Sequence, residues 1–226
     1  MSEIQYLRIG AFLPHSRVNG PGLRSVLWVQ GCDKSCEGCF NPDFRDHWAG
    51  QVHTVNEVAQ WILDADKTEG VTFSGGEPFA QAAALVEVAA RTKNAGKSIV
   101  IFTGFTHSEL CESNNPAWKN LLFLSDLLIC GPYKKDDPGS HPLLSSANQE
   151  LVFQGSRYQA SDFEKQTRRV EFRIQPGGDV VRTGFPKESF SGDFKNTFFL
   201  QTGGDYGIWT RFDDIIPHTH SYYPHR

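Results

Sequence analysis

Short apolar runs alternate with amphipathic stretches along roughly the first two thirds of the chain. The apolar runs are bounded by glycine or polar residues, a pattern that predicts buried strands. The stretches between them place apolar residues on one face at helical spacing. The predicted strands are 4–12, 25–30, 71–74, 98–102 and 126–129, and the predicted helices are 55–63 and 80–94. Strands that alternate with helices predict a parallel sheet and therefore an α/β fold.

The two predicted helices carry recognisable end signals. Thr54 stands three residues before Glu57, so the pair can form a capping box at the start of the first helix. Gly70 and Gly96 follow the last apolar positions, and we expect them to end the first and the second helix.

Two alternating runs near the C-terminus, 168–174 and 180–185, flank a glycine-containing turn, which predicts a β-hairpin. We therefore divide the chain into a core of residues 1–160 and an extension of residues 161–226 with this hairpin and a flexible tail. We interpret the basic face of the hairpin as solvated; its members are Arg168, Arg169, Arg173 and Arg182. A flexible end, rather than a metal site, is our interpretation of the tail histidines, His218, His220 and His225.

Composition limits the possible classes of function. A length of 226 residues suits one domain with a small appendage. No apolar run approaches the roughly 18 residues that a membrane span needs. The first ten residues also lack the basic and apolar segments of a signal peptide, so we expect a cytoplasmic protein without a membrane partner. The net charge of −4 gives no reason to expect nucleic-acid binding.

Three of the five cysteines follow the predicted strand 25–30 with the spacing C-x3-C-x2-C. Cys32, Cys36 and Cys39 therefore lie on a loop at the C-terminal end of a strand, where α/β folds place their chemistry. Three cysteines can hold a [4Fe-4S] cluster and leave one iron open to a substrate. A zinc site is the alternative, with His47 completing a Cys3His set. Disulfides are disfavoured, because five cysteines leave one unpaired.

A second motif follows the predicted strand 71–74. Gly75 and Gly76 are followed by a carboxylate, Glu77, and by Pro78 at a predicted helix start. Paired glycines allow a ligand to approach the backbone, and a carboxylate beside them can hold an ammonium group. Taken alone, the motif favours an ordinary turn from a strand into a helix.

The two motifs, in this order and at this spacing, resemble those of the radical S-adenosylmethionine (radical SAM) superfamily. The local sequence is most similar to the activating enzymes of glycyl-radical enzymes, and among them to the activators of anaerobic ribonucleotide reductase. The resemblance covers about residues 4–153. That length has room for roughly five or six β/α units, too few for a closed eight-unit barrel. A partial (β/α) barrel of radical SAM type, followed by the C-terminal hairpin, is the expected fold.

The resemblance also implies a mechanism and partners. It implies an oxidoreductase whose three cysteines hold a [4Fe-4S] cluster and which cleaves S-adenosylmethionine (SAM) reductively to a 5′-deoxyadenosyl radical. The expected partners are a glycyl-radical enzyme such as anaerobic ribonucleotide reductase, which receives the radical on a glycine, and a one-electron donor such as flavodoxin or ferredoxin.

Further site residues follow from the same resemblance. Glu77 and the glycines before it are expected to orient the amino group of SAM. Thr103 ends a strand near the expected nucleoside position, although a hydroxyl there is equally ordinary. Gly38 stands where many relatives have an aromatic residue, so Phe40 is expected to provide the adenine-stacking face. The expected SAM-binding residues are Phe40, Ser74, Gly75, Gly76, Glu77 and Thr103, with Asn19 and Arg24 as further candidates.

Several points stay open. A radical SAM enzyme that modifies a peptide or a small molecule, as in deazapurine synthesis, is the alternative enzyme. A structural zinc protein is the non-enzyme alternative. Cys111 and Cys130 are interpreted as buried packing residues. The segment 145–150 resembles a Ser-x-Asn-Gln segment of the ribonucleotide reductase activators, and the sequence gives it no chemical role.

Overall fold

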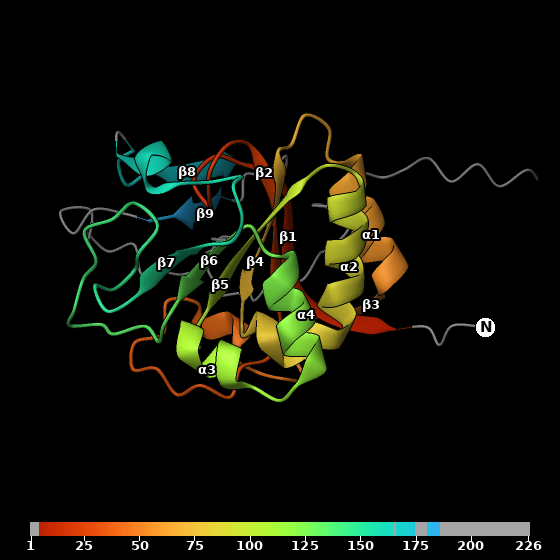
Figure 1. Cartoon of the computed structure of the whole chain (residues 1–226), viewed down its shortest axis with the longest axis horizontal. Helices are drawn as coiled ribbons and strands as arrows, with labels where there is room; N and C mark the ends of the chain where they lie inside the picture. Colours follow the sequence, from red (N-terminus) through yellow and green to blue (C-terminus); the bar gives the residue numbers. More distant parts are fainter. Residues whose placement is uncertain (1–4, 165, 175–179, 186–226) are drawn as a thin grey trace, which may run out of the picture.

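The structure is a computed structural model that describes residues 5–164, 166–174 and 180–185. Its centre is a seven-stranded sheet with the strand order β3-β1-β2-β4-β5-β6-β7 (Figure 1). The strands are β1 Tyr6–Ser16, β2 Arg24–Val29, β3 Gln51–Thr54, β4 Gly70–Gly75, β5 Ser98–Thr103, β6 Leu127–Cys130 and β7 Glu150–Phe153. The predicted α/β class is therefore confirmed, with a large sheet whose central strands are parallel.

The helices lie close to where the apolar spacing places them. They are α1 Val55–Asp64, α2 Ala82–Asn94, α3 His107–Glu112 and α4 Pro116–Leu124, with 3-10 turns η1 Pro42–Phe44, η2 Pro78–Gln81 and η3 Ala160–Phe163. The predicted capping box is present, because the Thr54 hydroxyl accepts a 3.2 Å hydrogen bond from the Glu57 amide. Gly70 does not end α1 as expected; the helix stops at Asp64, and Gly70 begins β4.

The parallel part of the sheet is smaller than expected. Only β2, β4, β5 and β6 run parallel in the described part of the chain, whereas β1, β3 and β7 pair antiparallel with their neighbours. The prediction of five or six β/α units is therefore wrong, because the sheet has fewer parallel strands than that number requires. The turn 17–23 joins β1 directly to β2, and it is too short for the helical crossover that parallel strands require. The partial-barrel curvature and the division after residue 160 stay predictions.

The two faces of the sheet are covered by different parts of the chain. Helices α1, α2 and α4 gather on one side, and a second sheet formed by β8 Val170–Ile174 and β9 Val180–Gly184 lies on the other (Figure 1). On this second side Val100 and Ile129 pack with Tyr158, Phe163 and Phe185. β8 and β9 pair antiparallel, as a hairpin requires, and the predicted turn 175–179 lies outside the described residues.

Two expectations about arginines are wrong. Arg24, a candidate site residue, is fully buried at the start of β2, at the opposite end of the parallel strands from the cysteine loop. Its guanidinium donates to Thr72 Oγ1 at 2.8 Å and to the Val71 carbonyl at 3.0 Å, and burial lowers its pKa. Arg24 therefore stabilises the fold. The hairpin arginines also do not form one solvated face, because Arg168 donates to the Leu144 carbonyl and Arg173 to the His15 carbonyl.

The tail histidines lie outside the described residues. Within the part of the chain that the structure describes, no helix has the length and apolar character that crossing a membrane requires.

Candidate functional site

The C-terminal ends of β2, β4, β5 and β6 meet around an open cavity of about 1010 Å³. All nine predicted cofactor residues line the cavity: Cys32, Cys36, Cys39, Phe40, Ser74, Gly75, Gly76, Glu77 and Thr103. The sequence motifs therefore converge on one place, as their positions after successive parallel strands predict.

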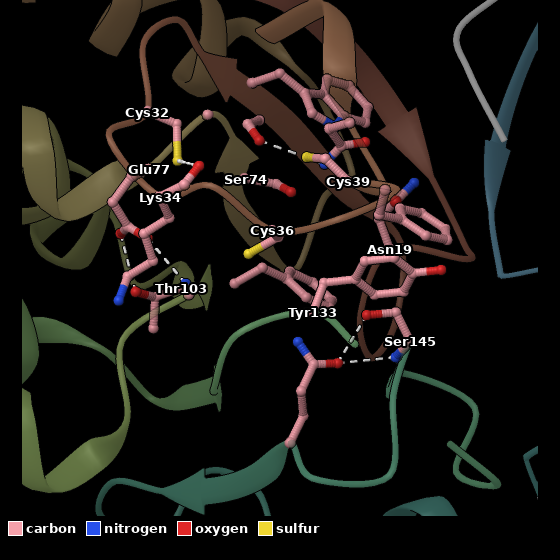
Figure 2. Close-up of a pocket in the computed structure, with 18 of the residues that line it drawn as sticks. Asn19, Cys32, Lys34, Cys36, Cys39, Ser74, Glu77, Thr103, Tyr133 and Ser145 are labelled. Carbon is pink, nitrogen blue, oxygen red and sulfur yellow. Dashed lines mark hydrogen bonds between the residues drawn. The ribbon is translucent and has the colours of Figure 1, made fainter. Parts of the chain in front are cut away.

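The cysteine loop leaves β2 at Gly31 and is held at its base by backbone hydrogen bonds. The amide of Gly31 donates to the Phe44 carbonyl at 2.9 Å, and the amide of Cys32 donates to the Arg45 carbonyl at 3.0 Å. The three thiols are free of disulfides and partly buried, and Figure 2 shows them around one space. Burial raises the pKa of the Cys32 and Cys39 thiols. A positive metal centre would reverse this effect by binding the thiolates.

The Gly-Gly-Glu turn after β4 is bound to the base of the cysteine loop. The Gly76 amide donates to the Val29 carbonyl at 2.8 Å, and the Glu77 amide donates to the Gly31 carbonyl at 2.9 Å. A Cβ atom on Gly76 would lie 2.2 Å from the Gly31 carbonyl oxygen. The glycines therefore allow two protein segments to pack closely. The space beside Gly76, which we expected to admit a ligand, is filled by backbone.

Glu77 is buried, with 3% of its surface exposed. Its carboxylate accepts hydrogen bonds from the Phe79 amide at 2.9 Å, the Thr103 hydroxyl at 2.9 Å and the Gly104 amide at 2.8 Å. Burial raises the pKa of Glu77 although these donors oppose it. A buried carboxylate of this kind is stabilised by a cationic group in the adjoining cavity.

Lys34 is a cavity residue that the sequence analysis missed. Its alkyl chain lies against Gly104, where a Cβ would come within 2.7 Å of Lys34 Cδ. The ammonium group lies 3.8 Å from the centroid of the Phe105 ring and 4.0 Å from a carboxylate oxygen of Glu109. The sequence could have indicated Lys34 as a site residue, because it lies between Cys32 and Cys36. Lys34 brings a positive charge to the side of the cavity where Glu77 lies (Figure 2).

Phe40 stands at the cavity wall, but one of its faces is already covered. Its ring stacks on Phe185 with centroids 5.6 Å apart and contacts Tyr133 edge-on at 6.1 Å. Phe185 and Tyr133 also line the cavity. Arg182, expected on a solvated face, also lines the cavity, and burial lowers its pKa.

Asn19 lines the cavity, as the resemblance implies, and its amide donates to Thr183 Oγ1 at 2.9 Å. The segment 145–150 has a structural role. Gln149 Oε1 accepts from the Ser145 amide and hydroxyl at 2.9 and 2.7 Å, while Gln149 Nε2 donates to the Gly131 carbonyl at 3.0 Å. This side chain therefore fixes the loop after β6 against the cavity.

The two remaining cysteines differ in their exposure to solvent. Cys130 is fully buried in the helix-side core, as expected, and burial raises its pKa to about 12. Cys111 is exposed on α3, so the prediction that it packs in the interior is wrong. A six-residue amphipathic helix buries only Leu110, and Cys111 is next to it on the outer side.

The donor set fits an iron–sulfur cluster better than a zinc ion. In the described residues no three His, Cys, Asp or Glu side chains lie close enough together to bind a single metal ion. A cubane cluster does not need this convergence, because each cysteine binds a different iron. His47, the fourth ligand of the zinc alternative, instead lies 2.8 Å from Asp33 Oδ1.

Comparison with known proteins agrees with this geometry. Residues 18–152 match the family model described as a 4Fe-4S single cluster domain. The anaerobic ribonucleoside-triphosphate reductase-activating protein of Vibrio cholerae is 33% identical over 150 residues, covering 62% of this chain and 94% of the relative. Its counterpart from Pasteurella multocida is 30% identical over 166 residues, covering 70% and 100%. The pyruvate formate-lyase-activating enzyme of Clostridium pasteurianum is 31% identical over 128 residues, covering 54% and 50%.

Proposed function

The chain belongs to the radical SAM family of enzymes that activate glycyl-radical enzymes, and from this premise we propose that it installs a glycyl radical on a partner such as anaerobic ribonucleotide reductase. Its cofactors are a [4Fe-4S] cluster and SAM. The single observation that carries the proposal is the convergence of the three cysteine thiols and the Gly-Gly-Glu turn on one cavity.

Each part of the cavity has a proposed task. Cys32, Cys36 and Cys39 would hold the cluster, and because three cysteines bind three of its four irons, the fourth iron would be accessible. When bound, the cluster supplies the electron that cleaves a carbon–sulfur bond of SAM, which gives methionine and a 5′-deoxyadenosyl radical. The protein itself supplies binding, orientation and exclusion of water.

Glu77 and Lys34 suit the charged end of SAM. The methionyl part carries an ammonium and a carboxylate, and these two side chains place one charge of each sign on one side of the cavity (Figure 2). Burial raises the pKa of Glu77. The ammonium group of SAM would stabilise the ionised form of this carboxylate. Because three donors already hold this carboxylate, the ligand meets a fixed group with little reorganisation.

Phe40, Ser74 and Thr103 also line the cavity and complete the proposed SAM site. Phe40 offers an aromatic face to the adenine, and Ser74, a half-buried residue near the end of β4, offers a hydroxyl. Thr103 acts through Glu77, to which its hydroxyl donates. A one-electron donor such as flavodoxin or ferredoxin is part of the same proposal.

The test has two stages, both under exclusion of oxygen. Full-length protein is reconstituted with iron and sulfide, reduced with dithionite and supplied with SAM, and 5′-deoxyadenosine and methionine are measured. The activated protein is then mixed with anaerobic ribonucleotide reductase or pyruvate formate-lyase, and the glycyl radical is detected by electron paramagnetic resonance.

The two stages separate the alternatives. Cleavage of SAM together with a glycyl radical on either partner supports the proposal. Cleavage without a radical on a glycyl-radical enzyme would favour a peptide or small-molecule substrate. A colourless protein that binds zinc and leaves SAM intact would contradict the assignment.

A further inference from the structure

The extension after the family match contributes to the cavity. The family model matches residues 18–152 and therefore ends before this extension. Residues 182–185, at the end of β9, nevertheless line the same cavity as the three cysteines. A segment that the family match leaves out therefore forms part of the cavity wall.

Specific contacts fasten this strand pair to the core. Asn19 Nδ2 donates to Thr183 Oγ1 at 2.9 Å, and the Thr183 hydroxyl is 3.2 Å from Asn19 Oδ1. The Ser16 hydroxyl donates to Glu171 Oε2 at 2.7 Å. These bonds join β8 and β9 to the end of β1 and the turn that follows it, and two of the residues, Asn19 and Thr183, are buried. These hydrogen bonds therefore fix the position of the strand pair beside the cavity.

Phe185 connects the strand pair to the cysteine loop. Its ring, only 6% exposed, lies between Phe40 and Phe102, with centroids 5.6 Å away on each side and interplanar angles of 21° and 25°. The three rings come from the cysteine loop, β5 and the end of β9. Phe40 directly follows Cys39, so a contact that orients the Phe40 ring also restrains the chain at a cluster ligand.

We propose that Phe185 is a positioning residue for the nucleoside part of SAM, because it holds the Phe40 ring flat and in place at the cavity wall. This inference rests on the proposed function. A stacking surface binds a base well only if its ring is already oriented, since ordering a mobile side chain reduces the affinity. The extension is therefore a fixed wall of the SAM site.

The experiment measures binding rather than turnover. Equilibrium dialysis of the reconstituted full-length protein gives the Kd for SAM and, separately, for methionine, which lacks the adenine. The variants are Phe185→Ala and Phe185→Leu, and urea unfolding of the metal-free proteins is measured beside them. Phe172→Ala is the matched control, because Phe172 lies in the same strand pair, opposite Arg182, and is 47% exposed.

We expect Phe185→Ala and Phe185→Leu to raise the Kd for SAM about tenfold, the size of a lost base–aromatic contact. The Kd for methionine should change less than about twofold. Leucine restores apolar volume but provides no flat ring. Phe185→Leu should therefore recover the free energy of unfolding that Phe185→Ala loses, but not the affinity for SAM. Phe172→Ala should have the same Kd values and the same free energy of unfolding as the wild-type protein.

Three results would overturn the inference: an unchanged SAM affinity in Phe185→Ala, an equal loss of methionine affinity, or full recovery in Phe185→Leu. If the unchanged protein itself bound no SAM after reconstitution, the proposed function would fail as well, and that failure is visible without any variant.

Discussion

The carboxylate of Glu77 accepts a 2.9 Å hydrogen bond from the hydroxyl of Thr103, so the turn after β4 is joined to the C-terminal end of β5. Both residues are buried. An ionised carboxylate in such surroundings requires hydrogen-bond donors, since its burial without them is strongly unfavourable. The contact links two segments of the cavity that are far apart in the sequence.

Replacing Thr103 by valine tests this link. Thr103→Val keeps the shape of the side chain and removes the hydroxyl, which leaves Glu77 one donor short. We expect the free energy of unfolding of the metal-free protein to fall by about 1–3 kcal/mol, measured by urea denaturation. Thr103→Ser retains the hydroxyl and should lose less. Equal stability of the valine variant and the unchanged protein would contradict a structural role for the bond.

The local pattern of the chain was sufficient to predict the core elements and the place of the site. Strands and helices follow from apolar spacing over short windows, and the cavity follows from two motifs that each come after a parallel strand. The sequence therefore predicts that Glu77 and the cysteines lie together, and all four line one cavity in the structure.

Other features depend on contacts between distant segments, which local patterns do not contain. The position of Arg24 near the cysteine loop in the sequence predicts a site residue, but its partners lie at the starts of β4 and β5. Phe185 reaches Phe40 across more than half of the chain. The number of parallel strands was overestimated because an apolar run alone does not give the direction of its neighbour.

Gly76 should tolerate no side chain. The space for a Cβ is occupied by the carbonyl oxygens of Gly31 at 2.2 Å and Phe44 at 2.6 Å, which belong to the base of the cysteine loop. Gly76→Ala must separate the two segments, and we expect a loss of about 3 kcal/mol in the free energy of unfolding together with reduced iron incorporation.

Gly96→Ala is the matched control for Gly76→Ala. Gly96 has a φ of 75° and no atom within 4 Å of the Cβ position, so its cost is backbone strain of about 1–2 kcal/mol. Iron incorporation should be unaffected. If Gly76→Ala were no more destabilising than Gly96→Ala, the proposed close packing of the two segments would be refuted.

The cysteines provide a direct comparison between a ligand and a surface thiol. Cys36 lines the cavity, whereas Cys111 is exposed on α3, where its sulfur lies 3.3 Å from His107 Nε2. We expect Cys36→Ala to lose the iron–sulfur absorbance and the bound iron after anaerobic reconstitution, because two thiolates hold a cubane poorly. Cys111→Ala should retain both. Iron binding by Cys36→Ala at the level of Cys111→Ala would exclude Cys36 as a ligand.

His53 should make the stability of the fold depend on pH. It lies on β3, and its ring meets Trp61 of α1 edge-on with centroids 4.6 Å apart. Burial lowers the pKa of His53 below its ordinary value of 6.5, although Glu57 opposes the shift. The unfolded chain therefore binds a proton at a higher pH than the folded chain does. The stability that His53 contributes is present above pH 6.5 and is lost as the pH falls towards the folded-state pKa.

His53→Phe keeps a flat ring against Trp61 and removes the titrating group. Urea unfolding of the metal-free wild-type protein and of His53→Phe is measured at about pH 7.5 and about pH 5.5. Because the two proteins share all other titratable groups, the difference between their losses of stability gives the contribution of His53. We expect the unchanged protein to lose more stability on acidification than His53→Phe does. Identical losses would mean that the imidazole is protonated as readily in the folded chain as in the unfolded one, and the contact with Trp61 would then not exclude the charged form.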